Sequence, residues 1–227
     1  MEQHSPLRER LIDVGVDLLL TEGTAALGLR EIARRAGVSH GAPRRYFPTH
    51  HSLLSAIARR GFADLGGRFV AATAGASSPR EQVRALGCAY IGYALEHRGM
   101  FELMFRHDLL DSEGQEGAGQ GESGQEESGQ EESGQEESGQ EESGQQPRLR
   151  ESTIPLFRLL VGLVSRCRAG GDPEVTAAAL WANLHGVAQL WAWGSLPLVL
   201  GGAAGHRAGV ERLVDAALDA HLGAVPA

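Results

Sequence analysis

Several features that whole classes of protein require are missing from this 227-residue sequence. It has no lysine, and all 21 basic residues are arginine, which fits a GC-rich coding bias better than any function. No run of 18 apolar residues occurs, so we expect no membrane-spanning helix. The N-terminus lacks the basic-then-apolar pattern of a signal peptide, and we therefore expect a cytoplasmic protein.

Cysteine is scarce, and the common catalytic motifs are absent. Cys88 and Cys167 stand alone without metal-ligand spacing, so we expect free thiols among core residues and no metal site. The sequence contains no G-x-S-x-G, no H-E-x-x-H, no P-loop and no glycine-rich dinucleotide turn. We therefore expect no enzymatic activity, no catalytic residues and no cofactor.

The net charge of −8 is unevenly distributed along the sequence. Residues 112–147 contain eleven glutamates and no arginine, and the remainder of the sequence has 21 arginines against 18 acidic residues. Residues 30–60 contain seven arginines and a single acidic residue, Glu31. The local field of this segment favours phosphate, although the whole chain is acidic.

The acidic part is a pentapeptide repeat, GQGES followed by four copies of GQEES. It has no aromatic or aliphatic residue and cannot offset the entropy cost of ordering. We predict a flexible acidic loop at residues 112–146. A solvated insertion expanded by repeat slippage is the favoured interpretation, and a DNA-mimicking loop that competes for the arginine-rich segment is the alternative.

Apolar residues recur at helical spacing along the rest of the sequence. These segments are preceded by Ser, Thr, Asp or Pro, which favour the start of a helix, and followed by Gly, which favours its end. This spacing predicts helices over residues 6–22, 50–72, 80–96, 100–110, 149–168, 174–196 and 207–222, with Pro155 as an alternative start of the fifth. We predict an all-α fold, with a three-helix domain at residues 1–50 and a larger helical bundle at residues 51–227. The helix at 174–196 is apolar nearly all round and is predicted to be buried. Together with the apolar stripe of the last helix, it has more apolar surface than one subunit core needs, which favours a two-fold dimer interface.

Residues 29–47, LREIARRAGVSHGAPRRYF, predict two short helices joined by a tight turn. Gly37 can take a positive φ and end the first helix, and Ser39 is the expected N-cap of the second. Pro43 is tolerable only in the first turn of that helix, and Pro48 ends it. A short helix, a glycine turn and a capped basic helix are typical of the helix-turn-helix motif, whose second helix enters the DNA major groove.

With its flanks, this segment runs R-x-x-L-I-x-x-G-x-x-L-L, then L-x-L-R-x-I-A-x-x-A-G-V-S, then Y-F-P-T-H-x-x-L-L-x-x-I. Over residues 7–60 it resembles the DNA-binding domain of the TetR family of one-component transcriptional regulators. Three positions differ from the family pattern: Gly28 replaces a Thr or Ser cap, Arg44 replaces a Tyr that touches phosphate, and His50 replaces a Lys.

The resemblance implies DNA contacts from residues around the turn. Ser39 and the amides of His40 and Gly41 can hold a phosphate at a helix N-terminus. Arg44 and Arg45 can reach guanine edges or phosphate, and the sequence leaves both open. The full predicted DNA-binding set is Arg30, Arg34, Ser39, His40, Gly41, Arg44, Arg45, Tyr46, Thr49 and His50.

In the C-terminal part, residues 180–186 resemble the WHG-type C-terminal domain of some TetR-like regulators. Trp181 and His185 are four residues apart and share a helix face. A Met-rich aromatic wall suits an adaptable lipophilic pocket, predicted from Met100, Phe101, Met104, Phe105, Phe157, Trp181 and His185. An ordinary core is the alternative for this set, and for His185 alone a satisfied core histidine is the favoured interpretation.

The resemblance thus implies a ligand-responsive transcriptional regulator, most simply a repressor that binds a near-palindromic double-stranded DNA operator as a homodimer. Its effector would be a lipophilic small molecule that changes the spacing of the two DNA-binding domains. An activator on the same fold is one alternative. A helical enzyme or scaffold that has lost DNA binding is the other.

Overall fold

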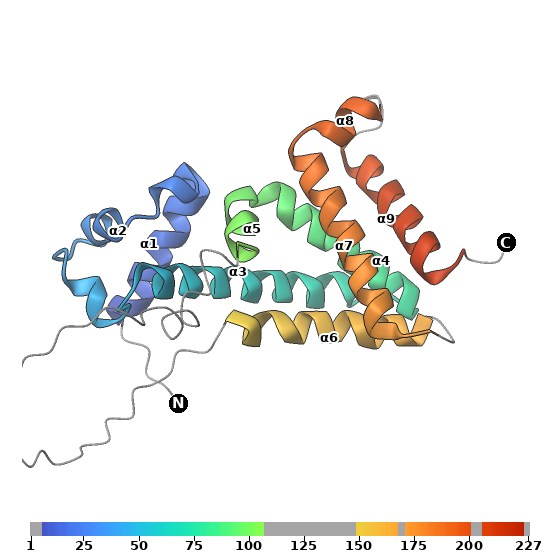
Figure 1. Cartoon of the computed structure of the whole chain (residues 1–227), viewed down its shortest axis with the longest axis horizontal. Coiled ribbons are helices and arrows are strands. Elements are labelled where there is room, and N and C mark those ends of the chain that lie inside the picture. Colours follow the sequence, from blue (N-terminus) through green and yellow to red (C-terminus); the bar gives the residue numbers. More distant parts are fainter. Residues whose placement is uncertain (1–5, 107–148, 168–170, 201–205, 225–227) are drawn as a thin grey trace, which may run out of the picture.

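The computed structural model of the protein describes residues 6–106, 149–167, 171–200 and 206–224. All regular structure in these ranges is helical, as the apolar spacing predicts, and they contain no strand. In Figure 1, α1 and α2 lie at one end of the molecule and α7, α8 and α9 at the other. In chain order the elements are α1 (Pro6–Glu22), η1 (Thr24–Ala26), α2 (Leu29–Arg35), η2 (Ala42–Arg45), α3 (His50–Thr73), α4 (Pro79–Glu96), α5 (Arg98–Met104), α6 (Leu149–Cys167), α7 (Pro173–Ala192), α8 (Ser195–Val199) and α9 (His206–Leu222).

The head, which we define as α1, η1, α2, η2 and the first turns of α3, is built around fully buried side chains. Those with no exposed surface include Leu11 of α1, Ile32 of α2, Phe47 in the loop before α3, and Ile57 of α3. Gly15 allows α1 to approach α3 closely, because a Cβ there would come within 2.4 Å of Ile57 Cδ1. These contacts hold the two halves of the helix-turn-helix against a common core.

The segment after α2 differs from the sequence-based expectation. Gly37 ends α2 with a φ of +67°, as predicted, but only the single 3₁₀ turn η2 follows, and it begins without a side-chain cap. In an α-helix capped by Ser39, the first bond to the Ser39 carbonyl would come from residue 43, but Pro43 has no N–H. Ala42 donates to that carbonyl instead, at 3.0 Å. The predicted recognition helix capped by Ser39 is therefore wrong, and the segment is a tighter and shorter turn.

Helix α3 connects the head to the body, which consists of α4 to α9 and the rest of α3 (Figure 1). Its first turn has a reciprocal capping box: Thr49 Oγ1 accepts the Ser52 N–H at 3.0 Å, and Ser52 Oγ accepts the Thr49 N–H at 3.3 Å. The helix extends to Thr73, one residue beyond the predicted end. Along the body it buries Phe62 and Phe69.

Helix α4 is central to the body and packs against α3, α6, α7 and α9. Its N-terminus also has a capping box, between Ser78 and Glu81. Arg84 of α4 donates to Asp215 of α9 through two bonds, Nε to Oδ1 at 2.6 Å and Nη2 to Oδ2 at 3.1 Å. This paired fork geometry fixes α9 along α4 more specifically than apolar packing alone.

Helices α7 and α9 distribute their apolar surface differently from the prediction. One face of α7 is buried through residues such as Leu184, but Val175 is 65% exposed, and Trp193, just after the helix, is 69% exposed. On α9 the predicted stripe, including Val214 and Leu218, faces the core of its own subunit. In the single chain no described element covers the outer face of α7, so the apolar surface in excess of the subunit core lies on α7 and not on the stripe of α9.

Two predicted boundaries fall near undescribed segments. Helix α5 ends at Met104, earlier than the predicted range of 100–110, whose residues from 107 onward lie outside the described part. The acidic loop predicted at 112–146 also lies outside it. Helix α6 begins at Leu149 and contains Pro155, so the earlier of the two predicted starts is right.

Candidate DNA-binding surface and ligand cavity

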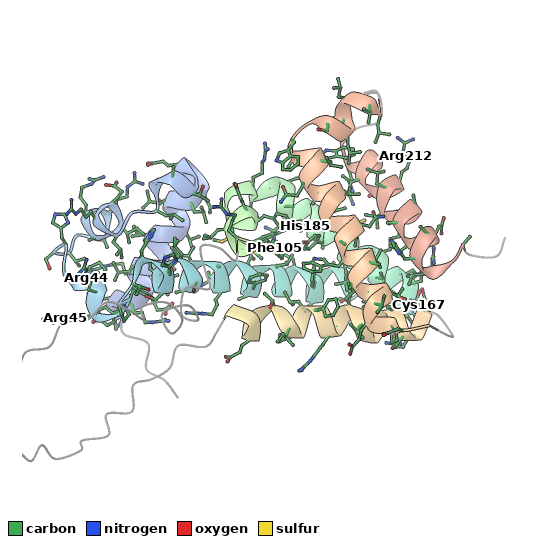
Figure 2. All side chains as sticks on the ribbon, viewed as in Figure 1. Arg44, Arg45, Phe105, Cys167, His185 and Arg212 are labelled. Atoms are coloured by element: carbon green, nitrogen blue, oxygen red, sulfur yellow. The ribbon has the colours of Figure 1, made fainter. Side chains whose placement is uncertain are left out.

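The basic side chains of η2 lie at the outer end of the head. Arg44 and Arg45 are both exposed, and Figure 2 shows them at the end of the molecule remote from Arg212 of α9. Among the residues that the structure describes, neither has a carboxylate partner. Their charges are therefore available to an external anion.

The arginines of α2 are differently placed. Arg34 donates to Glu31 from Nε at 2.9 Å and from Nη2 at 2.6 Å. Arg35 donates to Glu31 at 2.9 Å and also pairs with Glu22 of α1. Hydrogen bonds from Arg34 and then Arg35 lower the pKa of Glu31 to about 2. Arg35 thus ties α2 to α1, whereas Arg34, with a side chain 64% exposed, can exchange Glu31 for a phosphate at the surface.

Other predicted DNA-binding residues also organise the head. Thr49 caps α3, as described above, and the His50 ring nitrogen Nε2 is hydrogen-bonded to the Leu27 carbonyl oxygen, which joins the start of α3 to the loop before α2. Tyr46 is half-buried against the head core. The remaining members of the set, Arg30, Ser39, His40 and Gly41, are exposed. The structure thus brings all ten residues to one head, with Thr49 and His50 already bonded inside it.

A cavity of about 290 Å³ lies in the body between α3, α4, α6 and α7. Of the predicted pocket residues, Phe105, Phe157 and Trp181 line it, whereas Met100 and Met104 are buried in the adjacent core. Phe101 and His185 line a neighbouring, more polar cavity of about 250 Å³ that shares Phe105 with the first. Figure 2 shows Phe105 and His185 next to each other in the body. The residues lining the apolar cavity are Phe62, Leu65, Phe69, Leu86, Gly87, Tyr90, Phe105, Thr153, Ile154, Leu156, Phe157, Leu160, Trp181 and Leu184.

Tyr90 of α4, which is not in the predicted pocket set, supplies a polar group to this cavity. Its hydroxyl accepts the Trp181 indole N–H at 3.1 Å and lies 2.8 Å from His185 Nδ1. Burial raises the pKa of the Tyr90 hydroxyl and lowers the pKa of His185, so both groups are neutral at physiological pH. The spacing of Trp181 and His185 predicts that they share a face of α7, but the sequence does not show that this face packs against α4.

Other kinds of site find no support in the described part of the chain. No group of three His, Cys, Asp or Glu side chains there could hold a metal ion. No helix there is both long and apolar enough to cross a membrane. Cys88 and Cys167 are free and half-buried, and burial raises the pKa of both thiols, which makes them less reactive.

Comparison with known proteins agrees with the geometry of the head. Residues 11–57 match the family described as bacterial regulatory proteins, tetR family. Over 79 residues the chain is 39% identical to the HTH-type transcriptional regulator BetI of Rhizobium meliloti (strain 1021). That match covers 35% of this chain and 39% of the relative, so it spans about two fifths of the length of BetI.

Solved structures match almost the whole chain. A protein of unknown function from Rhodococcus sp. RHA1 is 26% identical, with a TM-score of 0.69 over 97% of this chain and 98% of the other. A TetR-like transcriptional regulator from the same organism is 18% identical, with a TM-score of 0.58 over 99% of this chain and 100% of the other. At that identity the second match shows the fold alone, including the arrangement of the helical body.

Proposed function

We propose that this chain, a TetR-family transcriptional regulator with a helix-turn-helix DNA-binding domain, is a ligand-responsive repressor that binds a near-palindromic operator as a homodimer in the cytoplasm. The observation that carries the proposal is the pair of exposed arginines on η2, which have no carboxylate partner among the described residues, within a head that matches the family. We further propose that residues 1–50 form the DNA-binding domain and residues 51–227 the ligand-binding and dimerisation domain, with α3 running through both.

Contact with DNA follows from the position of the charges. Residues 30–60 have seven arginines against one acidic residue, and that residue, Glu31, is already paired. A head of this charge attracts the phosphate backbone, and Arg44 and Arg45 are placed to reach phosphates or base edges. Because η2 is a single turn, the exposed backbone of residues 39–41 can come close to the DNA.

Dimerisation would use the outer stripe of α7, which we define as Val175, Ala179, Ala182, Gly186 and Leu190, with Trp193 just beyond the helix. These residues recur on the face opposite Leu180, Leu184 and Ala188, which are buried in the subunit. Small residues in the middle of the stripe allow close approach of a second helix. A two-fold interface formed by the same stripe on both subunits would cover this apolar face.

Coupling between the cavity and the head has a short physical route. Helix α3 contributes Phe62 and Phe69 to the cavity wall and begins in the head. Phe105 directly follows α5, and α5 touches α1 so closely that a Cβ at Gly99 would come 3.0 Å from the Leu19 carbonyl oxygen. A lipophilic effector that displaces Phe105 would shift α5 against α1. Such an effector would release DNA if it binds more tightly to the dimer conformation in which the spacing of the two heads does not fit the operator.

A salt-dependent binding measurement tests the proposal. Labelled duplexes from upstream of the protein's own gene are titrated with the full-length protein, and an unrelated duplex of equal length is the control. We expect binding at least about a thousandfold tighter to the specific duplex, together with a fall in affinity as salt rises. Equal affinity for both duplexes would contradict operator recognition. No salt-dependent binding at all would favour an enzyme or scaffold that has lost DNA binding.

A reporter assay separates repression from activation, which the same fold can perform. The gene downstream of the bound duplex is measured with and without the regulator. Under the proposal its expression rises when the regulator is deleted. A fall on deletion would instead identify an activator.

A further inference from the structure

The wall of the apolar cavity restricts the chemistry of its ligand. None of the fourteen described residues that line it is charged, and only Tyr90, Thr153 and Trp181 have polar side-chain groups. The Trp181 indole N–H is already donated to the Tyr90 hydroxyl. Thr153 is already engaged within the chain. An ion placed in such a cavity would lose its hydration without gaining a partner, at a cost too large for binding. The lining therefore favours an uncharged occupant.

The volume sets the size of this occupant. A cavity of about 150 Å³ lined by aliphatic and aromatic side chains holds one benzene molecule. The cavity here is about 290 Å³, roughly twice as large. It therefore accommodates a molecule of about two fused rings.

Hydrogen-bond accounting at Tyr90 determines which polar group the occupant presents. The Gln189 amide nitrogen lies 3.5 Å from His185 Nε2, an arrangement in which Gln189 donates and Nε2 accepts. In a neutral imidazole the proton is then on Nδ1, which donates to the Tyr90 oxygen at 2.8 Å. That oxygen also accepts from Trp181 at 3.1 Å, so both of its lone pairs are used.

The Tyr90 O–H then has no acceptor among the described residues, and Tyr90 lies in the cavity wall. A buried donor without a partner is costly, so an occupant that supplies an acceptor gains affinity. We propose that the cavity binds an uncharged, mainly apolar molecule of about two fused rings that carries one hydrogen-bond acceptor, such as a carbonyl oxygen, facing the Tyr90 hydroxyl. This inference rests on the proposed function, since it names the class of effector to which the regulator responds.

Three probes of nearly identical shape test the inference. They are methyl naphthyl ketone, the hydrocarbon in which a methylene group replaces its carbonyl oxygen, and the corresponding naphthoate. Binding to the full-length protein is measured by calorimetry without DNA. We expect the ketone and the hydrocarbon to bind, and the naphthoate to bind at least about a hundredfold more weakly than the ketone, because its carboxylate is desolvated without a partner.

Two matched variants isolate the hydroxyl. Tyr90→Phe removes only the proposed donor, and Tyr93→Phe removes a buried hydroxyl on the same helix that donates to the Gly61 carbonyl at 3.3 Å and does not line the cavity. We expect the ratio of ketone to hydrocarbon affinity to fall at least about fivefold in Tyr90→Phe and to stay unchanged in Tyr93→Phe. Thermal melting of each variant confirms that it is folded before its affinities are compared.

The outcomes are distinguishable from those of the proposed function. An unchanged ratio in Tyr90→Phe, equal binding of the naphthoate, or binding of neither neutral probe would overturn the inference, while operator binding measured separately would stand. Ketone binding that depends on Tyr90 but leaves operator affinity unchanged would support the ligand class and contradict the ligand response.

Discussion

The outer stripe of α7 gives the sharpest structural prediction. Ala182 lies near its centre and is exposed in the single chain. Ala182→Glu should leave the subunit folded, because an exposed alanine-to-glutamate change within a helix costs only a few tenths of a kcal/mol. In a two-fold dimer, however, the substitution occurs twice and places two carboxylates across the same interface.

The size of the effect follows from that geometry. Like charges facing each other at an interface cost several kcal/mol, and we take about 3 kcal/mol for this pair. At about 1.4 kcal/mol per factor of ten, the dimer dissociation constant should rise about a hundredfold. Substitution of Leu218 could not make this test, because Leu218 is 1% exposed and its loss would disturb the subunit core itself.

Sedimentation equilibrium over a wide concentration range measures the dissociation constant directly. Ala63→Glu on the exposed side of α3 is the matched control, since it adds the same charge at an exposed helical alanine outside the stripe. We expect the control to dimerise like the unsubstituted protein. A dissociation constant for Ala182→Glu within about threefold of the control would refute the assignment of this stripe as the interface, because that shift is well below the predicted effect.

Two further predictions concern the head, and a third concerns the packing of α9 on α7 in the body. Thr49→Ala should lower the free energy of unfolding by about 1 kcal/mol in urea titrations and Thr49→Ser should restore it, whereas equal losses would argue against the capping role. Glu31→Gln should tighten DNA binding at low salt, which DNA titrations measure. It should also abolish the stability that the ionised Glu31 contributes above pH 4.5. In the unsubstituted protein that contribution is lost as the pH falls toward the folded-state pKa of about 2, and thermal melts across this range measure it. Gly209→Ala should destabilise by about 1–3 kcal/mol because its Cβ would come 2.4 Å from Trp191 Cη2, while Gly92→Ala, with open space around it, should stabilise by up to about 1 kcal/mol; destabilisation by both would contradict the packing argument.

Local signals in the sequence were sufficient for most of the helices. Thr49 and Asp172 cap the helices predicted to follow them, and Gly37 ends α2 with the expected positive φ. These features depend on residues a few positions apart, which is why they can be read from a single chain. The sequence did not reveal how short η2 is. Its extent depends on the missing N–H of Pro43, which leaves the Ser39 carbonyl to accept from Ala42 and so tightens the turn.

Features that depend on contacts between distant segments were harder to predict from the sequence. The apolar character of α7 predicted burial, but it could not show that only one face meets the subunit core. Trp181 and His185 are recognisable as neighbours from their spacing, whereas Tyr90 is about 90 positions away and meets them only through the packing of α4 on α7. The predicted pocket set likewise mixed lining residues with adjacent core, because both are apolar and share the same helices.

The central claim is that η2 contacts DNA, and the salt dependence of binding by substituted proteins tests it most directly. Arg44→Ala and Arg45→Ala are compared with Arg212→Ala, an exposed arginine at the opposite end of the molecule (Figure 2). We expect each η2 substitution either to cost about 1–3 kcal/mol with relaxed specificity at one base pair, or to weaken binding to all sequences and reduce the salt slope by about one. Arg212→Ala should leave affinity unchanged. Operator affinity and salt slope that are the same in all three variants as in the unsubstituted protein would contradict the account.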